Sequence, residues 1–67
     1  MRIKEMVVEH EFTKQPIIVK NLEAEDSSEF EGFLRVKFLE AYKEFSAGDI
    51  VFINRDRVLK VIPLLLK

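Results

Sequence analysis

The stretch from residue 29 to residue 46 constrains the fold more than any other part of this chain. It lies in the region that holds five of the six phenylalanines, between residues 30 and 52. Apolar side chains recur in it at steps of three and four residues, at Phe30, Phe33, Leu34, Phe38, Ala41, Tyr42 and Phe45. Residues spaced in this way fall on one side of an α-helix. The spacing therefore predicts one amphipathic helix over residues 29–46.

The ends of this stretch also fit a helix. Ser28 and Glu31 have the spacing of a capping box, in which each side chain bonds a free backbone N–H of the first turn. Gly48 stands where the glycine that follows a helix C-terminus belongs. These two signals place the predicted helix between a polar loop at residues 23–28 and a turn near residue 48.

Two features of the same stretch argue for extended backbone instead. Gly32 weakens the first turns of a helix. Leu34, Val36 and Phe38 alternate with basic residues, as the two faces of a strand do. If residues 30–45 form two strands, the alternative fold is an all-β, SH3-like small barrel.

Four short segments around the central stretch have the pattern of strands. Residues 3–12 alternate in their second half, and residues 17–22 are rich in β-branched side chains. Residues 49–53 and 58–65 are mostly apolar and are separated by a polar turn. The short break around Pro16 predicts an antiparallel hairpin of the first two. The predicted fold is α+β, a small antiparallel sheet in ββαββ order with the helix on one face. Its predicted core joins the apolar side of the helix to Val8, Ile17, Val19, Val51, Ile53, Leu59 and Val61.

The chain has 67 residues and no cysteine, so one domain, residues 1–67, is predicted. A domain of this size buries only about 60% of the surface of its unfolded chain. Small domains offset that shortfall with disulfides, metals, tight packing or self-association. Without cysteine, disulfides and thiolate-bound zinc are excluded, and packing and self-association remain.

The C-terminal segment predicts where self-association occurs. Successive strand residues face opposite sides, so three adjacent leucines make both faces apolar. A proline breaks the hydrogen-bonded ladder and places a strand at a sheet edge. An apolar edge aggregates unless it is paired. The residues expected to contact a second copy are therefore Pro63, Leu64, Leu65 and Leu66.

The two halves of the chain carry opposite charge, although the net charge is −1. Residues 1–31 hold four basic and eight acidic side chains, and residues 32–67 hold seven basic and four acidic ones. The halves can attract each other or a second copy, or the basic half can bind nucleic acid. In that second reading the binding residues are Arg35, Lys37, Arg55, Arg57 and Lys60.

The chain offers few groups for catalysis or metal binding. His10 is the only histidine, and in a strand its neighbours Glu9 and Glu11 point to the opposite face, so the three cannot chelate one ion. Nothing pairs a nucleophile with a base, and no loop has the spacing of a calcium site. We expect neither enzymatic activity nor a cofactor or metal.

No apolar run is long enough for a signal peptide or a membrane span, so a soluble, cytoplasmic protein is expected. Its high content of charged residues, 34%, would also suit a thermophile. The sequence predicts a small protein-interaction or regulatory module that self-associates with a copy of itself or binds another protein. The alternative is a nucleic-acid-binding module.

Overall fold

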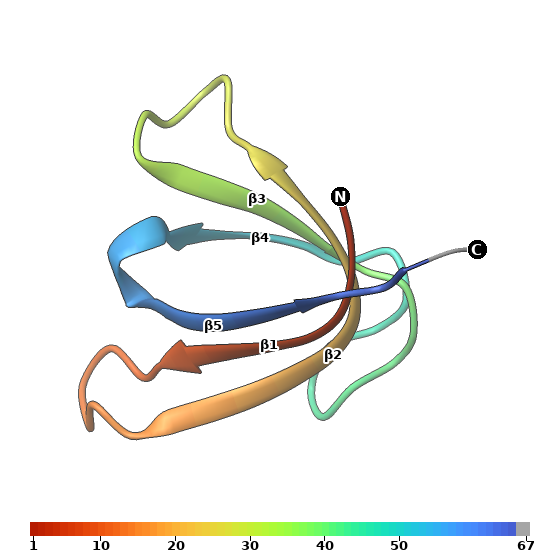
Figure 1. The fold of residues 1–67 in the computed structure, drawn as a ribbon, viewed down its shortest axis with the longest axis horizontal. Helices are drawn as coiled ribbons and strands as arrows, with labels where there is room; N and C mark the ends of the chain where they lie inside the picture. The colour runs from red at the N-terminus through yellow and green to blue at the C-terminus, as the bar shows by residue number, and fades with distance from the viewer. Residues whose placement is uncertain (66–67) are drawn as a thin grey trace.

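The computed structural model describes residues 1–65, and within them the chain forms one curled antiparallel sheet (Figure 1). A single turn of 3-10 helix, η1, is the only helical element of this described part. The strands follow the order β4-β3-β2-β1-β5, so β4 and β5 form the two edges. The elements are β1 (Arg2–Glu9), β2 (Pro16–Asp26), β3 (Phe33–Phe38), β4 (Ile50–Asn54), η1 (Arg55–Arg57) and β5 (Val58–Pro63).

The predicted α+β fold is wrong, because the central stretch contains a strand where the helix was expected. The alternation of apolar and basic residues decides the outcome: Val36 and Phe38 are buried in β3, whereas Lys37 between them is exposed. β3 lies between β2 and β4, so its backbone bonds to two neighbours rather than to itself. Tertiary pairing of this kind overrides a helical spacing of side chains.

The predicted capping box is wrong by one residue and caps no helix. Ser27 rather than Ser28 accepts hydrogen bonds on its Oγ, from the N–H groups of Glu29 and Phe30 at 3.1 and 3.0 Å. The chain then turns through Gly32, whose φ of 82° suits glycine, and enters β3. The polar loop predicted at residues 23–28 is also shorter than expected, since β2 continues to Asp26 and pairs with β3.

Residues 39–49 form a loop that returns the aromatic side chains of the predicted helix to the core. Tyr42 and Phe45 exchange two backbone hydrogen bonds of 2.9 Å. The Phe45 ring stacks on that of Phe38, with centroids 4.5 Å apart and planes 8° apart. The Tyr42 hydroxyl donates to the carbonyl of Ile18 in β2. The helical spacing therefore identified apolar side chains that do pack on the core, but it predicted the wrong backbone conformation for them.

The all-β class of the alternative fold agrees with the structure, but its closed barrel and its second strand do not. Residues 30–45 supply one strand and an isolated bridge. The sheet is open, because β4 pairs with β3 and β5 pairs with β1, and the ladder does not continue from β4 to β5. The other four predicted strands are present, and the antiparallel hairpin of β1 and β2 is confirmed.

The curl of the sheet comes from a matched irregularity in β1 and β2. Along a flat strand, side chains on the same face occur at every second residue. The buried residues Ile3 and Met6 are instead three positions apart, and so are Val19 and Leu22. Ile3 lies opposite Leu22 and Met6 opposite Val19, so the extra residue occurs at the same level in both strands. In β2 the extra residue is accommodated at Asn21, whose φ is 58°. Both strands bend there, and their inner faces enclose the core.

The core lies on the concave side of this curl. Its eight buried residues come from β1, β2 and β3, namely Ile3, Met6, Val8, Val19, Leu22, Ala24, Val36 and Phe38. Of the predicted core, Val8, Val19 and Phe38 are buried, and Ile17, Leu34, Tyr42, Phe45, Val51 and Ile53 pack against it while partly buried. Phe30, Leu59 and Val61 are exposed, which corrects their predicted place in the core.

Candidate functional site

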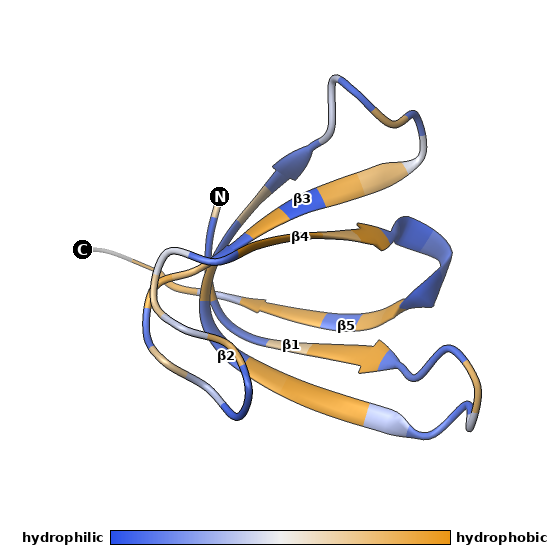
Figure 2. Cartoon of the chain, turned by 180° about the vertical axis from the view of Figure 1, so that it is seen from behind, coloured by the Kyte–Doolittle hydropathy of each residue, from blue (hydrophilic) through white to orange (hydrophobic). Residues whose placement is uncertain are grey.

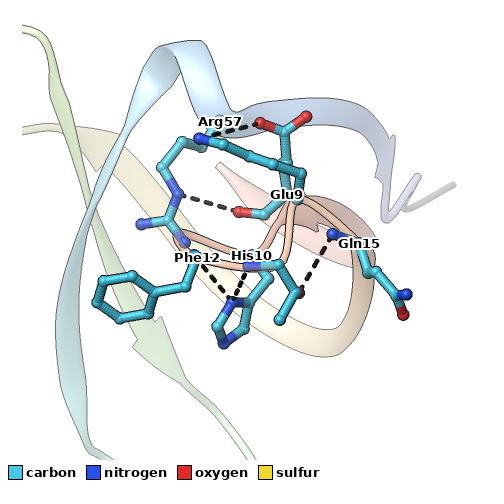
Figure 3. Close-up of polar contacts among 7 residues, drawn as sticks. Glu9, His10, Phe12, Gln15 and Arg57 are labelled. Carbon is cyan, nitrogen blue, oxygen red and sulfur yellow. Dashed lines mark hydrogen bonds and ion pairs between the residues drawn. The ribbon is translucent and has the colours of Figure 1, made fainter.

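His10 stabilises the turn between β1 and β2 (Figure 3). Its Nδ1 accepts hydrogen bonds from the N–H groups of Phe12 and Thr13, at 3.1 and 3.2 Å. Across from it, the Arg57 Nε donates to the carbonyl oxygen of Glu9 at 3.0 Å. His10 therefore follows β1 rather than belonging to it, and its imidazole nitrogen is engaged by the backbone. This arrangement fixes a turn and joins it to η1.

The five basic residues predicted for nucleic acid lie on different parts of the sheet, and two of them form ion pairs with carboxylates. Arg35 Nη1 lies 3.2 Å from Glu25 Oε1, and Arg55 Nη1 lies 3.3 Å from Asp26 Oδ1. Both carboxylates belong to β2, whose acidic end the sequence had placed in a loop. Lys37 lies opposite Glu23 in the β2–β3 ladder, and Lys60 lies on β5 at the other end of the sheet. Acidic groups of the N-terminal half thus form ion pairs with two of these five basic residues, Arg35 and Arg55.

Three of the four residues predicted for self-association lie at the end of the β5 edge of the sheet. Pro63 ends β5 and lies opposite Ile3 of β1, and Leu64 N–H donates to the Arg2 carbonyl at 3.1 Å. Leu64 and Leu65 are exposed, the latter at 80%. Leu66, the fourth residue of that prediction, lies outside the described residues. The exposed side chains of the described residues there form an apolar margin along β5, made of Leu59, Val61, Leu64 and Leu65.

The opposite margin, along β4, was not singled out in the sequence. Ile50 and Phe52 point to the convex side of the sheet and remain 42% and 37% exposed. The ring of Phe30 meets that of Phe52 edge to face, with centroids 5.0 Å apart. Figure 2 shows β4 as a hydrophobic strand that ends in the hydrophilic turn of η1. The sequence does contain a signal for this margin, since residues 50–53 are all apolar.

The open sheet leaves a pocket of about 500 Å³ on its concave side, near the start of β1. Apolar side chains of Ile3, Ala24, Leu34 and Val61 line it, and the Arg55–Asp26 ion pair stands at its rim. Val61 lies opposite buried Met6 and so faces inward, yet it is 38% exposed. Its exposure shows directly that the interior is incompletely covered on the β5 side.

The described part of the chain has little polar chemistry inside it. No polar or charged side chain of residues 1–65 is buried. Among the same residues, no three His, Asp or Glu side chains are grouped as metal ligands would be. No helix within residues 1–65 is long and apolar enough to cross a membrane.

The features that can act on another molecule are thus the two margins of the sheet and the pocket between them. Each margin presents backbone groups and apolar side chains, which suits binding of a protein strand. Comparison of the chain with protein-family models, with curated proteins and with solved structures finds no match.

Proposed function

We propose that this domain is a small non-catalytic protein-interaction or regulatory module that works in a self-associated form. The observation that carries the proposal is the open sheet, whose two edge strands both leave large apolar side chains exposed. Soluble monomers rarely expose continuous apolar patches of this kind, and open edges invite another strand. Contact with a second copy at either edge would cover the apolar side chains exposed there.

The size of the core supports the same proposal. Eight buried side chains from three strands stabilise the sheet, while β4 and β5 contribute none that is fully buried. A domain this small has a narrow stability margin, and binding a second copy increases the stability of the folded state by mass action. The non-catalytic part rests on the absence of buried polar groups within residues 1–65, since active sites usually hold such groups partly shielded from water.

Self-association is tested by sedimentation equilibrium over protein concentrations from micromolar to millimolar. The wild type is expected to have a mass above the 7.9 kDa of one chain, rising with concentration. The variant Leu65→Lys, Leu66→Lys tests whether the C-terminal run takes part, because charge opposes burial of apolar side chains. A mass lower than that of the wild type at each concentration assigns a contact to this run, and an unchanged mass assigns the contact to other surfaces. Phe12→Lys, an exposed apolar residue in the β1–β2 turn, is the matched control. A wild type that remains at 7.9 kDa throughout overturns the proposal.

Nucleic-acid binding is the weaker alternative, because Arg35 and Arg55 already contact carboxylates. We expect a titration of labelled single-stranded DNA or RNA at low salt to show no binding. Binding that falls steeply with salt and is lost in Arg55→Ala, Arg57→Ala would favour the alternative.

A further inference from the structure

We infer that two copies of this chain pair through β4, antiparallel and in a single register centred on Phe52, to form one continuous ten-stranded sheet. This inference rests on the proposed self-association and names a contact that it requires. The partner is a second copy because the β4 segment is complementary to itself. The geometry of the β4 edge, its charges and its contrast with β5 each support this choice.

The outer edge of β4 has free backbone groups at defined positions. Phe38 N–H donates to Asp49 at 2.9 Å and Arg55 N–H donates to Gly32 at 3.0 Å, so the odd-numbered residues of β4 face β3. In an antiparallel ladder, the residues between them direct N–H and C=O away from that neighbour. Ile50 and Phe52 therefore present their donors and acceptors to a further strand. With Phe52 opposite itself, the two copies exchange a pair of hydrogen bonds.

The register centred on Phe52 pairs charges as well as apolar groups. It sets Asp49 of each copy opposite Arg55 of the other, and these two residues are in register with β3 at the two ends of the β4 ladder. Both are exposed, and no other charged residue lies between them. Directly opposite side chains are close enough for opposite charges to stabilise a strand pair. A pairing centred on Val51 would instead set Asp49 opposite Ile53.

Apolar groups match on both faces of the same register. Phe52 faces its counterpart on the convex side, where each ring already contacts Phe30. Val51 faces Ile53 on the concave side, where both are half-buried. Pairing would cover the exposed area of Ile50 and Phe52, and it would join two Phe30–Phe52 pairs into one aromatic cluster.

The β4 edge lacks the features that protect the β5 edge. Lysine, proline and bulges on an edge strand discourage further pairing. β5 contains Lys60 and Pro63, and its register with β1 shifts twice. β4 contains neither residue type, and its register with β3 is unbroken over five residue pairs. The open edge that can receive a strand in regular register is therefore that of β4.

Two charge-reversed variants test this register when the association of each variant alone is compared with that of an equimolar mixture of the two. Asp49→Arg alone sets arginine opposite Arg55 at both ends of the contact, and Arg55→Asp alone sets aspartate opposite Asp49. Each variant is expected to raise the dimer dissociation constant about tenfold or more. An equimolar mixture restores both opposite-charge pairs in a mixed dimer. Native mass spectrometry should therefore show the mixed dimer in large excess over either homodimer.

Lys14→Asp is the matched control for this experiment. It reverses the charge of an exposed basic residue whose Nζ lies 4.0 Å from Glu9 Oε1, and it lies in the β1–β2 turn, away from the β4 edge. It is expected to leave the dissociation constant unchanged. Circular dichroism of every variant shows whether the sheet is still formed. If the wild type associates but the mixture associates no better than each variant alone, the β4 register is wrong, and self-association rests on other surfaces.

A disulfide experiment gives a second readout in a chain that contains no cysteine. In the proposed register, the two Cα atoms at position 52 are about 5.5 Å apart, within the range of a disulfide. Phe52→Cys is expected to oxidise to a covalent dimer, whereas Leu59→Cys on β5 is expected to stay a monomer. The reverse result would assign the contact to β5 and overturn the inference while leaving the proposed function in place. A wild type that stays monomeric overturns both.

Discussion

Replacing Val36 by aspartate is expected to leave the chain unfolded at 25 °C. The Val36 side chain has no exposed surface and lies in β3, between β2 and β4. A carboxylate there would lose its hydration, and the structure buries no basic side chain within residues 1–65 that could pair with it. An uncompensated buried charge costs about 3–5 kcal/mol or more. Small domains are stable by roughly 0.05–0.15 kcal/mol per residue, so the loss is comparable to the whole stability of this chain.

Far-ultraviolet circular dichroism and urea titration measure this result at one fixed protein concentration, because self-association changes apparent stability. Lys37→Asp is the control one residue away, on the exposed face of β3. Its expected cost is at most about 1 kcal/mol, from repulsion by Glu23 on the opposite strand. In a helix over residues 29–46, Val36 would face solvent. A folded Val36→Asp variant would therefore contradict the strand.

Truncating Phe38 to alanine is expected to cost about 3–5 kcal/mol of unfolding free energy. The ring is 2% exposed and stacks on Phe45, so its removal leaves a cavity that the curled sheet fills poorly. Phe38→Leu keeps most of the volume and is expected to cost about 1–2 kcal/mol. This milder variant keeps the measurement possible if the alanine variant does not fold.

The matched control for Phe38 is Phe12→Ala, since Phe12 is 82% exposed in the β1–β2 turn. Its expected effect is within about 0.5 kcal/mol. Urea denaturation midpoints of the four proteins should rank the wild type and Phe12→Ala together, then Phe38→Leu, then Phe38→Ala. Equal midpoints for the two alanine variants would show that the loop carrying Phe45 does not pack as described.

The sequence predicted strands well where the evidence was local. The period-two alternation of β1, the β-branched run of β2 and the polar turn after β4 each correspond to an observed element. The helix predicted over residues 29–46 is wrong because two patterns of apolar residues overlap there, the three-to-four spacing of a helix and the alternation of a strand. Phe38 and Phe45 are seven residues apart, which places them on one side of a helix, yet they stack because a loop folds back over a strand. The spacing of apolar side chains alone does not distinguish a helix from a strand followed by a loop that folds back over it.

The candidate contact surfaces depend on facts that are not local. Residues 50–53 are apolar on both faces, which suits a strand with neighbours on both sides. That β4 lies at an edge follows from the order of the whole sheet, which no short segment encodes. In the same way, the neutralisation of Arg35 by Glu25 requires the β2–β3 register. Only the C-terminal proline marked an edge in the sequence itself.

The position of β1 between β2 and β5 has a consequence for the rate at which this chain acquires its structure. The β1–β5 ladder joins residues as distant in the sequence as Ile3 and Pro63. The hydrogen bonds of this ladder form only after the long segment between β1 and β5 has closed into a loop, which costs conformational entropy. Proteins dominated by such long-range contacts fold in milliseconds to seconds. The hairpin of β1 and β2 can form early, whereas β5 can join it only after Val58–Pro63 have left the ribosome.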